Sequence, residues 1–98
     1  MKKYELTKKA KEDLNDIWNY TVDTWSEKQA DKYYKELISA FRKIAAIPLR
    51  FGNDYSGLLD GLRARHVGHH MVFYLRREDK TVLIVRILHE RMDYKRHF

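Results

Sequence analysis

Hydrophobic residues in the first half of the chain recur every three or four positions, in two successive segments. This spacing places them along one stripe of a helix, and so it predicts two amphipathic helices. Pro48 ends the second helix. Because almost no linker separates the segments, they are predicted to form an antiparallel helical hairpin. The stripes contain Ala10, Leu14, Ile17, Trp18, Thr21, Val22 and Trp25, then Ala30, Tyr33, Tyr34, Leu37, Ala40, Phe41, Ile44 and Ala45.

Two residues carry the signals of helix beginnings. Thr7 precedes the first apolar stripe and can cap the first helix. Ser26 begins the sequence Ser-Glu-Lys-Gln, in which the serine hydroxyl accepts from the N–H of Gln29 and the Gln29 side chain reaches back. The second helix is therefore predicted to start directly after Ser26.

Runs with the two-residue period of strands flank the hairpin. Residues 2–6 predict a short first strand, and residues 48–61 predict a loop because they are rich in Gly, Asn and Asp. Residues 62–67 alternate, which places Leu62, Ala64 and His66 opposite Arg63, Arg65 and Val67. Residues 70–77 and 81–88 are apolar on both faces, as central strands are, and a short polar turn joins them.

This order of elements predicts an α+β fold: an N-terminal strand, an antiparallel helical hairpin, a three-stranded antiparallel sheet and a short C-terminal helix. The helical hairpin is expected to cover one face of the sheet. The 98 residues are enough for one domain, 1–98, and too few for two.

Composition narrows the class of protein further. The absence of cysteine excludes disulfides and thiolate metal sites, and no segment approaches the roughly 20 apolar residues of a membrane span. A cytoplasmic protein is predicted, without cofactor or metal. The net charge of +6 indicates an acidic partner, either nucleic acid or protein. After Pro48, eight of the ten cations are arginines, and all five histidines occur there, so function is sought in the second half.

Three arginines on the predicted strands are the main candidates for recognition. Arg86 lies within the last strand among Val82, Ile84 and Leu88, and a buried arginine without an acidic partner is unfavourable. Two interpretations remain open. Arg86 pairs with an internal acid such as Asp60 or Asp93, or it joins Arg63 and Arg65 in a cationic floor on the uncovered face of the sheet.

The histidines and aromatic residues have simpler interpretations. His89 is the candidate for acid–base chemistry, since its ordinary pKa lies near neutrality, although a structural hydrogen bond is the commoner role. His66 is expected in the core. Adjacent His69 and His70 face opposite ways on a strand and cannot share a metal ion. The aromatic residues of the helices are expected to form the core and edge of the hairpin rather than a platform for bases: Trp18, Trp25, Tyr33 and Tyr34.

Three stretches carry a resemblance to a known family. They are residues 4–37, residues 61–74 (Gly-Leu-Arg-Ala-Arg-His-Val-Gly-His-His-Met-Val-Phe-Tyr) and residues 82–93 (Val-Leu-Ile-Val-Arg-Ile-Leu-His-Glu-Arg-Met-Asp). These stretches resemble the ParE branch of the RelE/ParE toxins of type II toxin–antitoxin systems, and the most specific parts are Gly-Leu-Arg at 61–63, His-His-Met-Val-Phe-Tyr at 69–74 and the end of the third stretch. The likeness covers nearly the whole chain. It implies a toxin with a ParD-like antitoxin as partner, and DNA gyrase or a related topoisomerase as target.

The resemblance leaves open which of two modes of action the protein has, that of the ParE branch or that of the RelE branch. RelE-type relatives cleave messenger RNA on the ribosome, and Arg63, Arg86, His89 and Tyr94 would be the catalytic residues in that case. The loop after Pro48 lacks the lysine cluster of those nucleases, which favours a binding toxin that is not an enzyme. A plain nucleic-acid- or protein-binding module is the remaining alternative, and direct contact with nucleic acid is left open.

The resemblance also assigns two sets of binding residues. Those expected to contact the target are Arg63, Arg65, Arg86, His89, Arg91, Tyr94, Lys95 and Arg96. Those expected to contact the antitoxin are Trp18, Trp25, Tyr33, Tyr34, Arg63 and Arg65.

Overall fold

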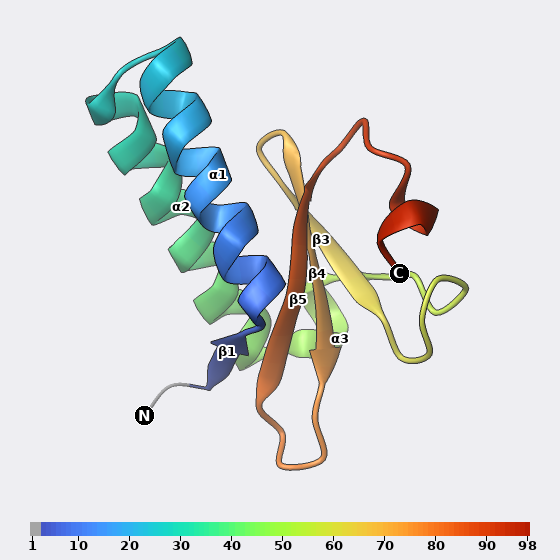
Figure 1. Ribbon diagram of the computed structural model, residues 1–98. Helices are drawn as coiled ribbons and strands as arrows, with labels where there is room; N and C mark the ends of the chain where they lie inside the picture. Colours follow the sequence, from blue (N-terminus) through green and yellow to red (C-terminus); the bar gives the residue numbers. More distant parts are fainter. Residues whose placement is uncertain (1–2) are drawn as a thin grey trace.

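The two helices predicted from the apolar spacing form an antiparallel hairpin against one face of a sheet (Figure 1). The computed structural model describes residues 3–98, with the side chain of Phe51 left out. Lys2, at which the first strand was predicted to begin, lies outside the described residues. The helices are α1 (Lys8–Thr24), α2 (Glu27–Ala46) and the short α3 (Pro48–Phe51).

Both predicted helix caps are present. The Thr7 side chain accepts from the N–H of Ala10 at 3.0 Å, and the Ser26 side chain accepts from the N–H of Gln29 at the same distance. Each bond satisfies one of the backbone donors left open at a helix start. Only Trp25 and Ser26 separate α1 from α2, so the hairpin turn is as tight as the sequence indicates.

The sheet has five strands rather than three antiparallel strands and a separate first strand. Its order is β1-β5-β4-β3-β2, and β1 pairs with β5 in parallel while the other pairs are antiparallel. The strands are β1 (Tyr4–Leu6), β2 (Asn53–Asp54), β3 (Arg63–Val67), β4 (His70–Arg76) and β5 (Val82–His89). The prediction that residues 48–61 form only a loop is therefore wrong, because they contain α3 and β2.

A β-bulge in β5 changes which side chains share a face. Phe73 is opposite Arg86 and Tyr74 is opposite Ile84, so Val85 is the extra residue on β5. Ile84 and Ile87 consequently pack in the core beneath the helices, whereas Leu88 packs on the opposite side of the sheet. The prediction that Arg86 shares its face with both Val82 and Ile84 is wrong, because uninterrupted alternation ends at the bulge.

The second face of the sheet has a core of its own. Leu62, Ala64, Phe73 and Leu88 are buried there, beneath the loop after β2 and the C-terminal segment. That segment ends in the short 3-10 helix η1 (Tyr94–His97), which Figure 1 shows folded back over the strands. Neither face of the sheet is open, so the predicted cationic floor on an uncovered face is wrong. Among the described helices, none has the length and hydrophobicity that crossing a membrane requires.

Candidate functional site

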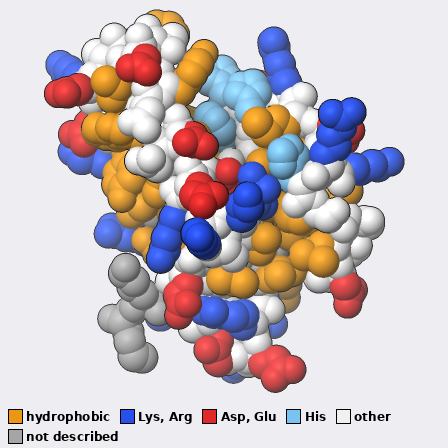
Figure 2. Space-filling view, viewed as in Figure 1, with side chains coloured by type: hydrophobic (Ala, Val, Ile, Leu, Met, Phe, Trp, Pro, Cys, Tyr) orange, Lys and Arg blue, Asp and Glu red, His pale blue; other side chains and the backbone are white. Residues whose placement is uncertain are grey.

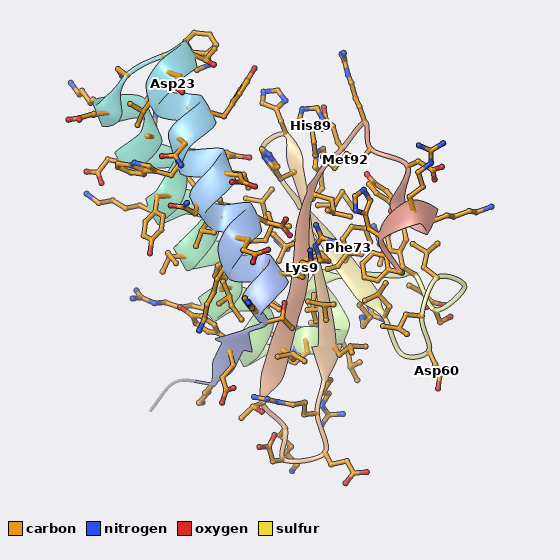
Figure 3. All side chains as sticks on the ribbon, viewed as in Figure 1. Lys9, Asp23, Asp60, Phe73, His89 and Met92 are labelled. Atoms are coloured by element: carbon orange, nitrogen blue, oxygen red, sulfur yellow. The ribbon has the colours of Figure 1, made fainter. Side chains whose placement is uncertain are left out.

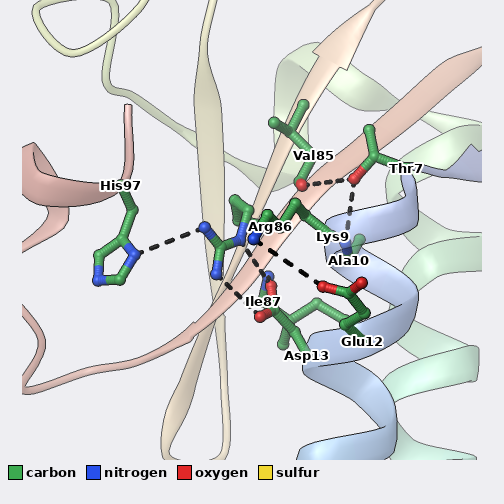
Figure 4. Close-up of polar contacts among 9 residues, drawn as sticks. All are labelled: Thr7, Lys9, Ala10, Glu12, Asp13, Val85, Arg86, Ile87 and His97. Atoms are coloured by element: carbon green, nitrogen blue, oxygen red, sulfur yellow. Dashed lines mark hydrogen bonds and ion pairs between the residues drawn. The ribbon is translucent and has the colours of Figure 1, made fainter.

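Arg86 is paired with an acid of the first helix. Its Nε and Nη2 atoms donate to the two carboxylate oxygens of Asp13 at 2.8 and 2.9 Å, and both side chains are largely buried (Figure 4). These hydrogen bonds raise the pKa of Arg86 above its ordinary value, against the opposing effect of burial. The predicted internal pairing of Arg86 is therefore correct in kind, but the acid is Asp13 rather than Asp60 or Asp93.

The location of Asp13 follows from the short first strand. Because β1 ends at Leu6, the outer edge of β5 beyond Ile84 is covered by the start of α1 instead of by a strand. Thr7 donates through its hydroxyl to the Val85 carbonyl at 2.7 Å, and Asp13 accepts from the N–H of Ile87 at 3.0 Å. Asp13 thus accepts three hydrogen bonds from β5, two from the Arg86 side chain and one from the backbone of Ile87.

The other two arginines of the predicted floor lie on the opposite face from Arg86. Arg63 is opposite Tyr74 and Arg65 is opposite Val72, both of which belong to the core beneath the helices, whereas Arg86 is opposite Phe73. Arg63 donates to the carbonyls of Gly52 and of Leu49, the latter at 3.0 Å, and so holds α3 and the residue that follows it. Arg65 lines a groove beside α2.

A cluster of histidines occupies the end of the sheet that lies near the turn between α1 and α2. His70 and His89 are a cross-strand pair with ring centroids 5.4 Å apart, and His69 stacks against His89 at 6.4 Å. Glu90 lies 2.6 Å from Nε2 of His66 and 3.6 Å from Nδ1 of His69. Its hydrogen bond with His66, above all, lowers the pKa of Glu90. His66 is exposed, so its predicted place in the core is wrong.

Tyr33 fixes this cluster to the second helix. Its hydroxyl donates to the Val67 carbonyl at 3.1 Å, accepts from the N–H of His69 at 3.2 Å and lies 2.6 Å from Nδ1 of His70. Burial of the hydroxyl raises the pKa of Tyr33. Gly68 permits this approach, since its φ is +58° and a Cβ atom there would lie 2.6 Å from the Tyr33 ring.

The cluster faces a groove between α1 and the strand ends, and we call it the histidine groove. Its volume is about 460 Å³, and a second hollow of about 290 Å³ adjoins it through the shared residues Tyr20, His70 and His89. Figure 2 shows the histidines gathered between the helical hairpin and the sheet, and Figure 3 places His89 and Met92 at this end. The lining residues of the histidine groove are Tyr20, Thr21, Trp25, Gln29, Tyr33, His69, His70 and His89.

Acidification is expected to destabilise the protein through His70. Burial, with the neighbouring His89 and His69, lowers the pKa of His70 to about 4, and the carboxylates Glu90 and Asp13 act in the opposite direction. The unfolded chain takes up a proton near pH 6.5, before the folded chain does, so stability falls as the pH decreases from about 7 towards 4. We expect a loss of about 1 kcal/mol between pH 7.5 and 5, since the ring keeps part of its hydration.

Urea unfolding at both pH values measures this effect. His70→Asn removes the titrating ring and should flatten the dependence, whereas the exposed His66→Gln should retain most of it. An equal slope in the His70→Asn variant and in the wild type would contradict the assignment.

The C-terminal tail divides into buried rings and exposed charges. Tyr94 and Phe98 each pack against Phe73 with ring centroids 5.0 Å apart, and the Tyr94 hydroxyl donates to the Glu90 carbonyl at 2.8 Å. Asp93 caps η1 by accepting from the N–H of Lys95 at 3.3 Å. Tyr94 is thus part of the second core, and the predicted target-binding residues of the tail that face solvent are Arg91, Lys95 and Arg96.

The aromatic residues of the hairpin lie on two different surfaces. Trp18 and Tyr34 form an edge-to-face pair at 6.3 Å and line a hollow of about 320 Å³ on the hairpin. Trp25 is 74% exposed and lines the histidine groove, as Tyr33 does. The prediction that these aromatic residues form the core and edge of the hairpin is correct in outline, but Trp25 lies on the surface.

The residues that a RelE-type nuclease would use are not gathered in one place. Arg86 and His89 line the hollow beside α1, whereas Arg63 and Tyr94 are absent from its lining. Arg63 begins β3, and His89 ends β5 at the far end of the sheet. Within residues 3–98, no group of three or more histidine and carboxylate side chains is placed to hold a metal ion.

Asp13 and the histidine cluster are the features that sequence reasoning missed. Asp13 is one of several acids on the polar side of its helix, and nothing in the sequence distinguishes it. The cluster had only a partial signal in the sequence. Regular pairing of the two predicted central strands across their short turn brings His70 opposite Leu88, next to His89, and the bulge at Val85 then shifts its partner to His89.

This architecture matches that of a chain in a solved structure. A chain of the structure titled "Chromosomal ParDE TA system from P. aeruginosa" superimposes with a TM-score of 0.76, covering 91% of this chain and 96% of that one. The two sequences are only 19% identical, so this likeness concerns the fold.

The sequence comparisons identify the family. Residues 4–94 match the ParE toxin of type II toxin–antitoxin system, parDE. Toxin ParE1 of Caulobacter vibrioides is 39% identical over 99% of this chain and 98% of its own length. Toxin ParE of Escherichia coli is 40% identical over 95% and 89%, and Toxin ParE1 of Mycobacterium tuberculosis is 37% identical over 97% and 96%. The chain belongs to the ParE toxins of type II ParDE toxin–antitoxin systems.

Proposed function

We propose that this ParE toxin binds and inhibits DNA gyrase or a related topoisomerase and breaks no bonds itself. The observation that carries the proposal is the ion pair of Arg86 with Asp13, which neutralises the one strand arginine that a nuclease could place beside His89. A ribonuclease needs free cations to hold the negative charge that develops on the scissile phosphate. Arg63 donates to backbone carbonyls, which supports the same conclusion.

We further propose that a ParD-type antitoxin, encoded with the toxin, neutralises this protein by covering its apolar surface. Tyr20, Trp25 and Met92 are 66%, 74% and 47% exposed and border the histidine groove or the adjoining hollow. Exposed apolar side chains gathered beside a groove are typical of a binding surface. Trp18 and Tyr34 offer a second apolar contact on the hairpin.

Purified toxin is expected to inhibit gyrase supercoiling and to accumulate cleaved DNA, and the antitoxin should reverse both effects. The triple variant Arg91→Gln/Lys95→Gln/Arg96→Gln removes the exposed cations of the tail, and we expect at least a tenfold weaker inhibition. Electrostatic contact with an acidic target is the physical reason. A supercoiling assay across toxin concentrations measures the change.

The matched control is Lys8→Gln/Lys9→Gln/Lys11→Gln, which removes the same charge from exposed positions of α1. This control should inhibit as the wild type does. Cleavage of ribosome-bound messages, with gyrase left active, would instead establish the RelE-type nuclease.

A further inference from the structure

A basic groove runs between α2 and the outer edge of the sheet, and no residue that lines it also lines the histidine groove. It has a volume of about 500 Å³, and we call it the lysine groove. Glu36 is the lone acid among the described residues that line it. The basic side chains along it come from both walls: Lys32, Lys35 and Lys43 from α2, and Arg65 and His66 from β3.

The helix wall presents its lysines in a line. Lys32, Lys35 and Lys43 are separated by three and eight residues, so they lie along one side of α2. At 1.5 Å per residue, the eleven residues from Lys32 to Lys43 extend for about 16 Å. Lys35 has an ion pair with Asp31 at 3.7 Å, but both side chains are strongly exposed, and such pairs contribute little.

The opposite wall is a sheet edge that no strand covers. The short β2 pairs only with Arg63 and Ala64, so within the described chain the outer side of β3 from Arg65 to Val67 adjoins the groove instead of a further strand. Arg65 points to the α2 side of the sheet, since its cross-strand neighbour Val72 belongs to the core beneath the helices. Arg65 therefore faces the lysines of α2 across the groove, and its neighbour His66 is bonded to Glu90.

The groove lacks the apolar anchor that a protein partner would use. Its apolar lining residues are Ala40 and Val67, and none of the exposed large hydrophobic residues of the described chain lines it. Stable protein interfaces usually depend on a few buried aromatic or large apolar residues. A phosphodiester backbone needs no such anchor, because neutralisation of its phosphates supplies most of its affinity.

We propose that the lysine groove binds the phosphate backbone of duplex DNA. A 16 Å line of lysines spans about five base-pair steps at 3.4 Å each, which allows contact with three or four phosphates. The further assignment of this duplex as the DNA held by the topoisomerase rests on the proposed function. In that complex, the toxin would touch the nucleic acid as well as the enzyme.

Fluorescence anisotropy with a labelled 20-base-pair duplex, in the absence of gyrase, tests the groove by itself. The wild type should bind with an affinity that falls steeply with salt, with a slope of log K against log salt of about −3. Lys32→Gln/Lys35→Gln/Lys43→Gln should bind at least tenfold more weakly and with a shallower slope. The α1 control with Lys8, Lys9 and Lys11 replaced has the same net charge and should lose much less affinity.

Equal weakening in the two triple variants would overturn the proposal, because it would mean diffuse attraction to a basic protein. Absence of salt-dependent binding by the wild type at 50 mM salt, or stronger groove-dependent binding of polyglutamate than of DNA, would also overturn it. Thermal unfolding checks that both variants are folded. Gyrase inhibition is measured separately. If the wild type binds DNA through the lysine groove but leaves gyrase active, the proposed gyrase target is refuted while the proposed DNA binding by the groove stands.

Discussion

Asp13→Asn is expected to lower the free energy of unfolding by about 3 kcal/mol, a large part of the 5–15 kcal/mol typical of a domain. The substitution leaves the buried guanidinium of Arg86 without its counter-charge. It also places the NH₂ group of the asparagine side chain, a hydrogen-bond donor, against the N–H donors of β5. The N–H of Ile87 also loses a charged acceptor. Urea unfolding followed by circular dichroism measures the change.

Two further variants identify the cause of this loss. Asp16→Asn changes an exposed acid on the same helix and should alter stability by less than about 0.5 kcal/mol. Asp13→Leu combined with Arg86→Met removes both charges and should recover most of the loss, apart from the unsatisfied N–H of Ile87. A single Asp13→Asn variant that unfolds as the wild type does would show that solvent, rather than Asp13, stabilises Arg86.

Gly52→Ala is expected to destabilise the protein by about 2 kcal/mol. A Cβ atom at this position would overlap the Tyr74 side chain, with 2.8 Å to its Cζ atom, and Tyr74 is fully buried. The ring cannot move freely, because its hydroxyl donates to the Pro48 carbonyl and the Gly52 carbonyl accepts from Arg63. Overpacking of a filled core typically costs about 1–3 kcal/mol.

Gly57→Ala is the matched control, since a Cβ atom there meets nothing within 4 Å. It should be neutral or slightly stabilising, because alanine restricts the unfolded chain. Adding Tyr74→Phe to Gly52→Ala removes the atom nearest to the new methyl group. The two substitutions should therefore cost less together than the sum of their separate effects. Strict additivity in the unfolding free energies would argue against a direct overlap.

The buried ion pair of Arg86 and the backbone hydrogen bonds of Arg63 show that these two candidate binding arginines have structural roles. Arg86 stabilises the junction of α1 with β5, and Arg63 stabilises the segment from Leu49 to Gly52. Variants at either position would reduce toxicity by unfolding the domain as readily as by removing a contact. The exposed cations of the tail and of the lysine groove are the positions at which binding can be tested with the fold intact.

The helical hairpin is the part of the fold that local sequence predicts well. Its apolar spacing, the caps at Thr7 and Ser26, and the stop at Pro48 all depend on residues within a few positions of one another. The two long strands of the sheet follow from continuous apolar runs for a similar reason. The short elements α3 and β2 were missed, since four and two residues carry too little pattern and β2 exists only through its pairing with β3.

The sequence by itself determined the α+β class, the hairpin, the basic charge and the membership of the ParE family. Tertiary structure alone decided which charges remain available for binding. The bulge at Val85 reversed the side chains that follow it, the shortness of β1 let Asp13 reach the edge of β5, and the tail closed the second face of the sheet. Each of these features depends on contacts between residues far apart in the chain. Small differences in packing and desolvation energy determine which ion pair a charged side chain forms there.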